Sequence, residues 1–160
     1  MSMVLNFLLS EHTSEDGLER YYHIDDTSEE ELNSIRSRVW LIEDDVLAYK
    51  SLSYPTLFAM EVVMDEIERL SAGLTEFYHY SDITEVRDRG TAELRHYVAD
   101  RVNKMEGMIH IIYVYNTNRF MRTVVKYFMR LIQIKPFSVV KNHEDALNVI
   151  KELRSKRGSK

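Results

Sequence analysis

The middle of the chain shows a helical period of apolar residues after Thr56. Apolar side chains recur there every three or four positions, with charged residues between them: Met60, Val63, Met64, Ile67 and Leu70. This period predicts an amphipathic helix that ends before Gly73. Three more helices are predicted over residues 91–105, 119–132 and 144–154. The last should begin at Asn142 as N-cap and bury a stripe made of Ala146, Val149, Ile150 and Leu153.

Short runs of β-branched and aromatic residues predict strands between these helices. Residues 39–42 and 46–52 flank a polar turn, Glu43-Asp44-Asp45, and this pattern predicts an antiparallel hairpin. Further strands are predicted over residues 77–83, 108–115 and 137–140. Because these strands alternate with helices, we expect them to pair in parallel through right-handed crossovers.

The first 38 residues have a different character and are predicted to form an N-terminal arm. An apolar run, a polar segment from His12 to Gly17 and a tyrosine-rich stretch predict two short strands or an irregular arm. Thr27 and Glu30 have the spacing of a capping box that starts a short helix to about Arg36. Burial of the apolar run requires the arm to pack on a sheet edge or to exchange between two protomers.

Length and composition predict one soluble α/β domain over residues 39–154, followed by a basic tail at 155–160. The chain has 160 residues, of which 44% are hydrophobic and 29% charged, an ordinary globular balance. No apolar run is long enough to cross a bilayer, and residues 3–9 lack the basic flank of a secretory signal. These features predict a cytoplasmic location without membrane insertion.

The composition also excludes several kinds of bond and site. With no cysteine, the chain cannot form disulfides, thiolate metal sites or a cysteine nucleophile. The net charge of -5 argues against nucleic acid as a partner. A solvated helix end explains the basic C-terminal residues, although a junction to further sequence would fit them too: Lys151, Arg154, Lys156, Arg157 and Lys160.

No sequence pattern of a common catalytic or cofactor site is present. There is no Gly-x-Ser-x-Gly, and neither a phosphate-cradling nor a dinucleotide glycine motif occurs. His79 and His110 lie on predicted neighbouring strands, but no further ligand stands at metal-binding spacing with them. Asp82, Glu85 and Asp88 would suit acid/base chemistry, yet exposed acids on a loop are usually solvated. We therefore predict no enzyme activity, no metal and no cofactor.

The segment from Tyr80 to Thr91 is the most informative candidate for a partner surface. It leaves a strand and enters a helix, and in open α/β sheets ligands and partners dock at such edges. The residues proposed to contact a partner carry charges or hydroxyl groups: Asp82, Thr84, Glu85, Arg87, Asp88, Arg89 and Thr91. A structural explanation competes, because Thr91 suits an N-cap, Gly90 a tight turn and Asp88 the helix dipole.

A second strand exit, from Tyr115 to Arg119, extends the candidate surface. Free amides at the helix start, together with Asn116 and Arg119, would receive a carboxylate or phosphate. Asn118 as an ordinary N-cap is the competing explanation. The helix that follows is apolar over more than one stripe, which fits a dimer contact, a pocket wall or packing between sheet and helix.

Three segments carry a resemblance to a known family. They are the hairpin at residues 39–47, the strand exit at residues 82–86 with Arg95 in the next helix, and the ending at residues 142–147. Together they resemble the STAS domain, and more closely its divergent SpoIIAA-like or STAS/SEC14-like branch. The resemblance implies a mixed sheet of about four or five strands with an opening antiparallel hairpin and helices largely on one face. It also implies a role in bacterial protein–protein signalling.

The chain departs from the phosphorylated members of this family at one position. Those antagonists carry a serine within an Asp-Ser-x-Gly turn, whereas this chain reads Arg87-Asp88-Arg89-Gly90. Asp88 would then mimic a constant negative charge, or Thr84 or Thr91 would serve as the phosphate acceptor.

Two functions are consistent with the sequence. The first is a non-enzymatic regulatory domain that binds a signalling protein, a kinase or another regulator, through the edge from Asp82 to Thr91, with a homodimer left open. The alternative is a small apolar-ligand or lipid-binding module of SEC14-like type. An excess of methionine and phenylalanine suggests it: Met60, Met64, Met105, Met108, Phe120, Met121, Phe128 and Met129.

Overall fold

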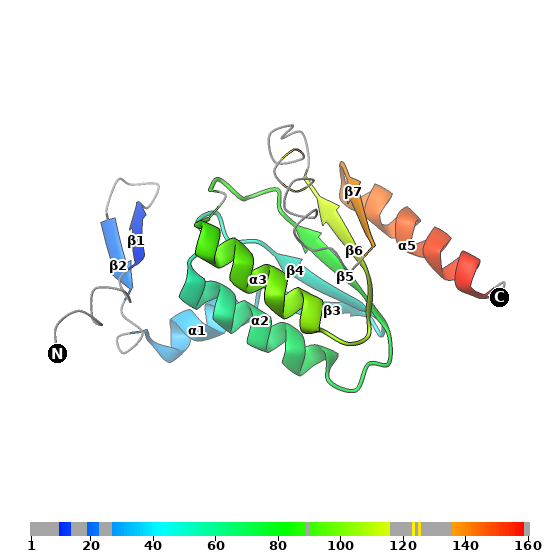
Figure 1. The fold of residues 1–160 in the computed structure, drawn as a ribbon, viewed down its shortest axis with the longest axis horizontal. Helices are drawn as coiled ribbons and strands as arrows, with labels where there is room; N and C mark the ends of the chain where they lie inside the picture. The colour runs from blue at the N-terminus through cyan, green and yellow to red at the C-terminus, as the bar shows by residue number, and fades with distance from the viewer. Residues whose placement is uncertain are drawn as a thin grey trace.

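A five-stranded mixed sheet forms the centre of the molecule (Figure 1). The computed structural model describes residues 10–13, 19–22, 27–88, 90–115, 123, 125 and 136–158. The strands follow one another across the sheet in chain order: β3 (Val39–Glu43), β4 (Val46–Lys50), β5 (Phe77–Asp82), β6 (Met108–Val114) and β7 (Phe137–Val140). β3 and β4 form an antiparallel hairpin, and β4 to β7 pair in parallel. The predicted α/β class, strand number and opening hairpin are confirmed.

Helices cover both faces of the sheet, three of the four described on one side. α2 (Leu57–Ser71) and α3 (Ala92–Lys104) pack on one face, and α1 (Glu29–Arg36) adds Ile35 to the same core. α5 (His143–Gly158) packs on the opposite face, as Figure 1 shows. As expected, most of the described helices, α1, α2 and α3, lie on one face. The other face is covered by α5.

Strand β5 shows why both faces need cover. Successive side chains of a strand point to opposite faces. Phe77 and His79 accordingly lie among the residues under α2 and α3, whereas Tyr78 and Tyr80 belong to the core cluster under α5. All four are at most 6% exposed. A parallel strand buried on both faces usually reads as a continuous apolar run, and β5 departs from this pattern at His79 and Ser81.

Helices α2 and α3 each begin after a threonine that serves as N-cap, a role that the sequence predicted for Thr91. The Thr56 hydroxyl accepts a hydrogen bond from the Ala59 amide at 3.0 Å, and the Thr91 hydroxyl accepts one from the Leu94 amide at 3.1 Å. Each bond satisfies an amide that would otherwise lack a partner at a helix start. Further along their length, Arg101 joins the two helices.

Arg101 of α3 links the two helices that lie over the sheet. Its guanidinium group donates to the carboxylates of Asp65 and Glu68 on α2, each at 2.8 Å, and to the Tyr97 hydroxyl at 2.8 Å. These hydrogen bonds raise the pKa of Arg101 above its ordinary value against the opposing effect of partial burial. α2 and α3 therefore pack as a connected pair.

Helix α5 confirms the predicted cap, while the predicted stripe is buried at Ala146 and Ile150 and partly buried at Val149 and Leu153. The Asn142 side chain accepts a hydrogen bond from the Asp145 amide at 2.8 Å, and Ala146 and Ile150 are buried against the sheet. The helix continues to Gly158, beyond the predicted end at Arg154. Arg154 forms ion pairs with Glu43, at 2.7 Å, and with Asp45 in the β3–β4 hairpin. This basic residue of the C-terminal run thus anchors α5 to the sheet.

The N-terminal arm contains a small antiparallel pair, β1 (Ser10–Thr13) and β2 (Glu19–Tyr22). Two short strands were expected, but β1 lies in the segment that was assigned to the polar connection. The apolar run before it lies outside the described residues, as does helix 119–132 except for Thr123 and Val125, which are both helical. Val125 is buried in the core under α2 and α3.

The capping box of α1 is shifted by one residue from its predicted place. Ser28, not Thr27, is the N-cap: its hydroxyl accepts from the Glu31 amide at 3.2 Å, and the Glu31 carboxylate accepts from the Ser28 amide at 3.1 Å. Both Thr27-x-x-Glu30 and Ser28-x-x-Glu31 fit the pattern, so spacing alone did not decide between them.

Substitution of this cap should weaken α1. Ser28→Ala is expected to lower the free energy of unfolding by about 1 kcal/mol, because the Glu31 amide loses its acceptor. Ser28→Asn should retain most of the stability, since asparagine also caps helices well. Urea unfolding followed by circular dichroism measures both. Equal stability of the alanine and asparagine variants would contradict the capping role.

Candidate functional site

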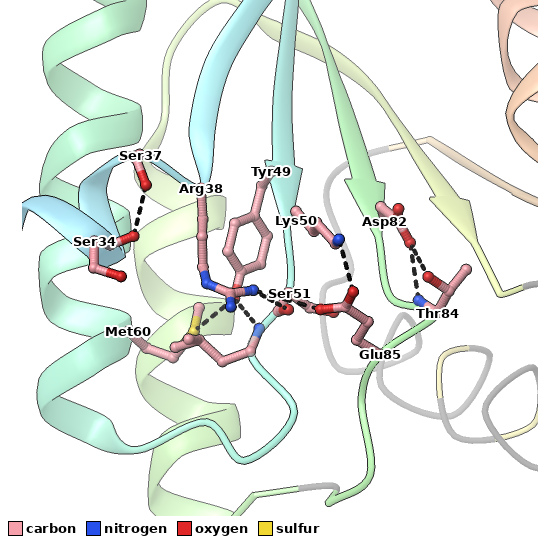
Figure 2. A network of polar contacts seen from close by, with 11 residues as sticks. Ser34, Ser37, Arg38, Tyr49, Lys50, Ser51, Met60, Asp82, Thr84 and Glu85 are labelled. Atoms are coloured by element: carbon pink, nitrogen blue, oxygen red, sulfur yellow. Dashed lines mark hydrogen bonds and ion pairs between the residues drawn. The ribbon is translucent and has the colours of Figure 1, made fainter.

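The carboxyl ends of β4 and β5, with the starts of α2 and α3, form the edge that the sequence singled out (Figure 2). At the end of β5, the Asp82 carboxylate accepts hydrogen bonds from the Thr84 amide at 2.9 Å and the Thr84 hydroxyl at 2.7 Å. Such a turn, in which an aspartate side chain binds the backbone two residues on, reverses the chain without a glycine. Asp82 and Thr84 are thus brought together, and their contact shapes the loop.

Glu85 ties this loop to the neighbouring strands. Its carboxylate pairs with Lys50 at 2.6 Å and with Arg38 at 3.7 Å, and Arg38 also donates to the Ser51 carbonyl at 2.9 Å. The hydrogen bond from Lys50 is the main reason why the pKa of Glu85 lies below its ordinary value. The pair is exposed, where such contacts contribute little to stability, so its main effect is to fix the position of the loop.

The residues from Asp88 to Thr91 have structural roles in their loop, in agreement with the structural explanation given from the sequence. The Asp88 carboxylate accepts from the Gly90 amide at 3.3 Å, and the Arg95 guanidinium donates to the Gly90 carbonyl at 2.6 Å. Gly90 has a φ of +68°, and a Cβ built there would lie 2.4 Å from Leu94 Cδ2. Gly90 therefore permits both the backbone conformation and the close approach of α3.

Six of the proposed partner-binding residues lie along this one edge: Asp82, Thr84, Glu85, Arg87, Asp88 and Thr91. Arg87 is exposed, while its amide donates to the Ser53 carbonyl at 2.9 Å. Arg89, Asn116 and Arg119 lie outside the described residues. β5 and β6 are adjacent and parallel, so the loop after β6 begins at the same edge, as expected. Binding of a partner here stays a prediction.

The two-histidine metal site considered from the sequence does not form. β5 and β6 are neighbours as expected, but the register pairs His79 with Ile111 and His110 with Tyr78. His79 therefore points toward α2 and α3, and His110 points to the face covered by α5. His110 Nε2 lies 2.9 Å from the Ser138 hydroxyl. Within the described ranges, no group of three or more metal-binding side chains occurs.

A cavity beneath the edge is a feature that the sequence did not reveal. It has a volume of about 160 Å³ and lies between the sheet and the pair α2 and α3. Apolar side chains of the two helices line it on one side, among them Met60, Met64, Val98 and Val102. Asp88 and Arg95, where the loop enters α3, also line it, so the cavity reaches the edge described above.

The sheet side of the cavity carries polar groups. Tyr49, Ser81 and Tyr113 lie side by side in the register of β4, β5 and β6, with His79 two residues earlier on β5. The Tyr49 hydroxyl lies 3.3 Å from Met60 Sδ, as Figure 2 shows. Burial raises the pKa of Tyr49 to about 12 and lowers the pKa of His79 to about 4. Both side chains are therefore neutral at neutral pH.

Two residues that line the cavity, His79 and Ser51, each carry a buried polar atom without a hydrogen-bond partner within the part of the chain that the structure describes. These atoms, Nδ1 of His79 and Oγ of Ser51, have almost no accessible surface, so neither faces the free volume. A third such atom, Oδ1 of Asn103, belongs to a residue that does not line the cavity. Buried polar groups without a partner are uncommon and cost free energy.

The available sequence signal for this site was the alternation within β5. His79 and Ser81 stand two positions apart in β5, on either side of Tyr80, so two polar side chains share one buried face. Sequence reasoning considered His79 only as a metal ligand or an acid/base group. It also noted the methionine excess, and Met60, Met64 and Met108 do line the cavity.

Comparison of the chain with protein-family models, curated proteins and solved structures finds no significant match. The family resemblance stated from the residues therefore stays a proposal. Among the described helices, none combines the length and apolar character needed to cross a membrane.

Burial of neutral His79 should make stability depend on pH. Its pKa is about 4 in the native state against an ordinary value of 6.5, so only the unfolded chain binds this proton between those pH values. The free energy of unfolding should fall as pH drops through this window, by up to about 1.4 kcal/mol per pH unit from this residue. Urea unfolding at several pH values should show a shallower decline for His79→Leu.

The exposed His96 provides the matched control for this measurement. His96→Leu should keep the pH dependence of the unsubstituted chain, since this side chain lies on the outer side of α3. If His79→Leu and His96→Leu declined with the same slope as the unsubstituted chain, the buried neutral state of His79 would be wrong.

Proposed function

We propose that this chain is a non-enzymatic binding domain that takes up a small apolar molecule between its sheet and helices α2 and α3. The observation that carries this proposal is the cavity of about 160 Å³, which is lined mainly by apolar side chains and also by Tyr49, Ser81 and Tyr113 of the sheet. Ligand sites typically combine an apolar lining with a few placed polar groups. The alternative function considered from the sequence, an apolar-ligand module, agrees with this geometry.

The position and lining of the cavity support uptake of a ligand. It reaches the carboxyl ends of β4 and β5, where ligands bind in open α/β sheets. Met60, Met64 and Met108 contribute flexible thioether side chains, which adapt to the shape of an occupant. Methionines also fill ordinary cores, so the free volume beside them, rather than their number, supports the proposal.

The arrangement of the acidic residues supports a binding role over catalysis. Asp82 accepts from Thr84, Glu85 pairs with Lys50, and Asp88 accepts from Gly90, so each acid shapes its own loop. General acid/base catalysis requires a group within hydrogen-bond reach of a reacting proton, together with a convergent second group. The cavity side of the sheet instead presents neutral histidine, serine and tyrosine side chains.

Methionine methyl groups provide a direct test of cavity binding. On titration with toluene, the ¹³C-methyl NMR signals of Met60, Met64 and Met108 should shift saturably, because these side chains line the cavity. Met105 is buried but does not line the cavity, so its signal should move much less. Val98→Phe should weaken binding at least about tenfold by filling the space, since overlap with a filled site prevents entry.

His96→Phe is the matched control, because it adds the same side chain to the exposed side of α3. This variant should bind toluene as the unsubstituted chain does. Absence of any saturable shift in the unsubstituted chain, or equal binding by Val98→Phe and His96→Phe, would overturn the proposed cavity function.

A second candidate function is the regulatory one, in which the edge from Asp82 to Thr91 binds a signalling protein. The observation that favours it is the fixed geometry of this charged and exposed loop, which Lys50 and Arg38 hold through Glu85. A surface that is ordered before binding loses less conformational entropy on association. The STAS resemblance implies the same role in bacterial signal transduction.

Reversal of one exposed charge tests this second candidate. Arg87→Glu should abolish capture of a partner from a bacterial lysate, because the charge complementarity of the edge is lost. Lys151→Glu makes the same charge change on the exposed side of α5 and should leave capture unchanged. Identical sets of captured proteins with both variants would count against a partner at this edge.

A further inference from the structure

Three residues with hydroxyl groups form a row across the sheet side of the cavity. Tyr49 on β4, Ser81 on β5 and Tyr113 on β6 stand level with one another in the strand register, and all three line the cavity. Each is at most 8% exposed. The row concentrates hydrogen-bonding groups at one level of a lining that is otherwise mainly apolar.

The hydroxyl groups of the two tyrosines differ in their partners. The Tyr49 hydroxyl accepts a hydrogen bond from the Leu52 amide at 3.4 Å and donates to Met60 Sδ at 3.3 Å. The Tyr113 hydroxyl has no hydrogen-bond partner among the described residues, and its oxygen is not one of the unpartnered atoms with almost no accessible surface. Because Tyr113 belongs to the core under α2 and α3 and lines the cavity, this oxygen is accessible from the free volume.

A tyrosine hydroxyl in this situation lacks an acceptor. Buried tyrosine hydroxyls usually have a hydrogen-bond partner, and an unsatisfied donor costs free energy. Burial raises the pKa of Tyr113, so the hydroxyl keeps its proton at neutral pH and remains a donor. An occupant that supplies an acceptor atom satisfies this donor.

The neighbouring Ser81 is less accessible to an occupant. Side chains in strands stand roughly perpendicular to the sheet, so the serine hydroxyl stays close to the backbone. The Tyr113 hydroxyl lies at the far end of its ring and therefore farther from the sheet. A molecule between the sheet and the helices meets the Tyr113 hydroxyl first.

Charge and volume restrict the rest of the ligand. The charged residues of the described lining are Asp88 and Arg95, one acid and one base, and His79 is neutral. An ion would lose its hydration without a net countercharge, which is costly. The roughly 160 Å³ is close to the volume of engineered apolar cavities, about 150 Å³, that take up one benzene molecule. A neutral molecule with one ring fits both limits.

We infer that Tyr113 is the polar anchor of the cavity, and that its hydroxyl donates a hydrogen bond to a neutral, ring-sized molecule with one acceptor atom. This inference rests on the proposed ligand-binding function and specifies the class of ligand, that of cyclic ketones and similar ring compounds. The acceptor lies toward the edge, because Tyr113 is the last residue but one of β6. The ring lies near Met60, which contacts Tyr49 in the same row.

Cyclohexanone and methylenecyclohexane, which differ by an oxygen in place of a CH2 group, test this inference on the full chain. Tyr113→Phe removes the hydroxyl and keeps the ring. In ¹³C-methyl NMR titrations followed at Met60, this variant should bind cyclohexanone about three- to tenfold less tightly than the unsubstituted chain, the range expected of one hydrogen bond. Its affinity for methylenecyclohexane should be unchanged. Each ligand is compared with itself, so the different hydration of the two compounds cancels.

Two matched variants act on the same row. Tyr49→Phe makes the same change at a hydroxyl that already has partners, and Ser81→Ala removes the hydroxyl next to Tyr113. Both should retain the ratio of the two affinities found for the unsubstituted chain. Loss of cyclohexanone affinity in Ser81→Ala but not in Tyr113→Phe would overturn the anchor and place it at Ser81.

The infrared carbonyl band of bound cyclohexanone reports the contact itself. A hydrogen bond weakens the C=O bond, so the band should lie at lower frequency in the unsubstituted chain than in cyclohexane solution. This readout also decides the question if Tyr113→Phe proves too unstable to measure. A band at the frequency found in cyclohexane would show that the carbonyl accepts no hydrogen bond.

The outcomes separate this inference from the function on which it rests. If neither compound shifts the methionine signals of the unsubstituted chain, the proposed ligand-binding function fails. If both bind, and Tyr113→Phe weakens both equally or neither, the cavity function stands and the Tyr113 anchor is wrong.

Discussion

Burial of strand β5 on both faces is the constraint on which the rest of the molecule depends. Five consecutive residues of this strand, from Phe77 to Ser81, are buried. A strand in this position needs a cover on each side, which α2 and α3 provide on one face and α5 on the other. The same constraint removes water from the side chains of residues 77–81. A histidine is tolerated there only as the neutral imidazole, and its hydrogen bonds must come from the protein or from a bound molecule.

The two helix layers are attached to the sheet in different ways. α5 is tied to the β3–β4 hairpin by ion pairs of Arg154, and its buried stripe lies directly on tyrosines of β5. α2 and α3 are tied mainly to each other through Arg101, and the cavity lies between them and the sheet. The cavity thus lies on the face that α2 and α3 cover. Packed cores rarely contain a void larger than a water molecule, so this free volume is unusual for a protein interior.

Local patterns predicted most of the fold, because each element had its own signal. The Glu43-Asp44-Asp45 turn predicted the opening hairpin, the apolar period after Thr56 predicted α2, and Thr91 predicted the start of α3. The cap of α1 was predicted one residue early, because two overlapping segments fit the same spacing. The direction in which His79 and His110 point depends on strand register, which their spacing along the chain does not encode. The cavity is the volume that side chains from several separate segments leave unfilled, and no local sequence pattern indicates the size of that volume.

Gly90 couples the loop at the edge to the free volume beneath it. Its α-carbon approaches Leu94 so closely that a β-carbon would lie 2.4 Å from Leu94 Cδ2, and Leu94 lines the cavity. Any larger residue at position 90 would force Leu94 to give way, and the unoccupied space beside Leu94 is the cavity itself. A glycine at position 90 therefore leaves room for the Leu94 side chain beside the loop, so that Leu94 is not displaced into the cavity. The capacity of the cavity is set in part by a residue that never touches its contents.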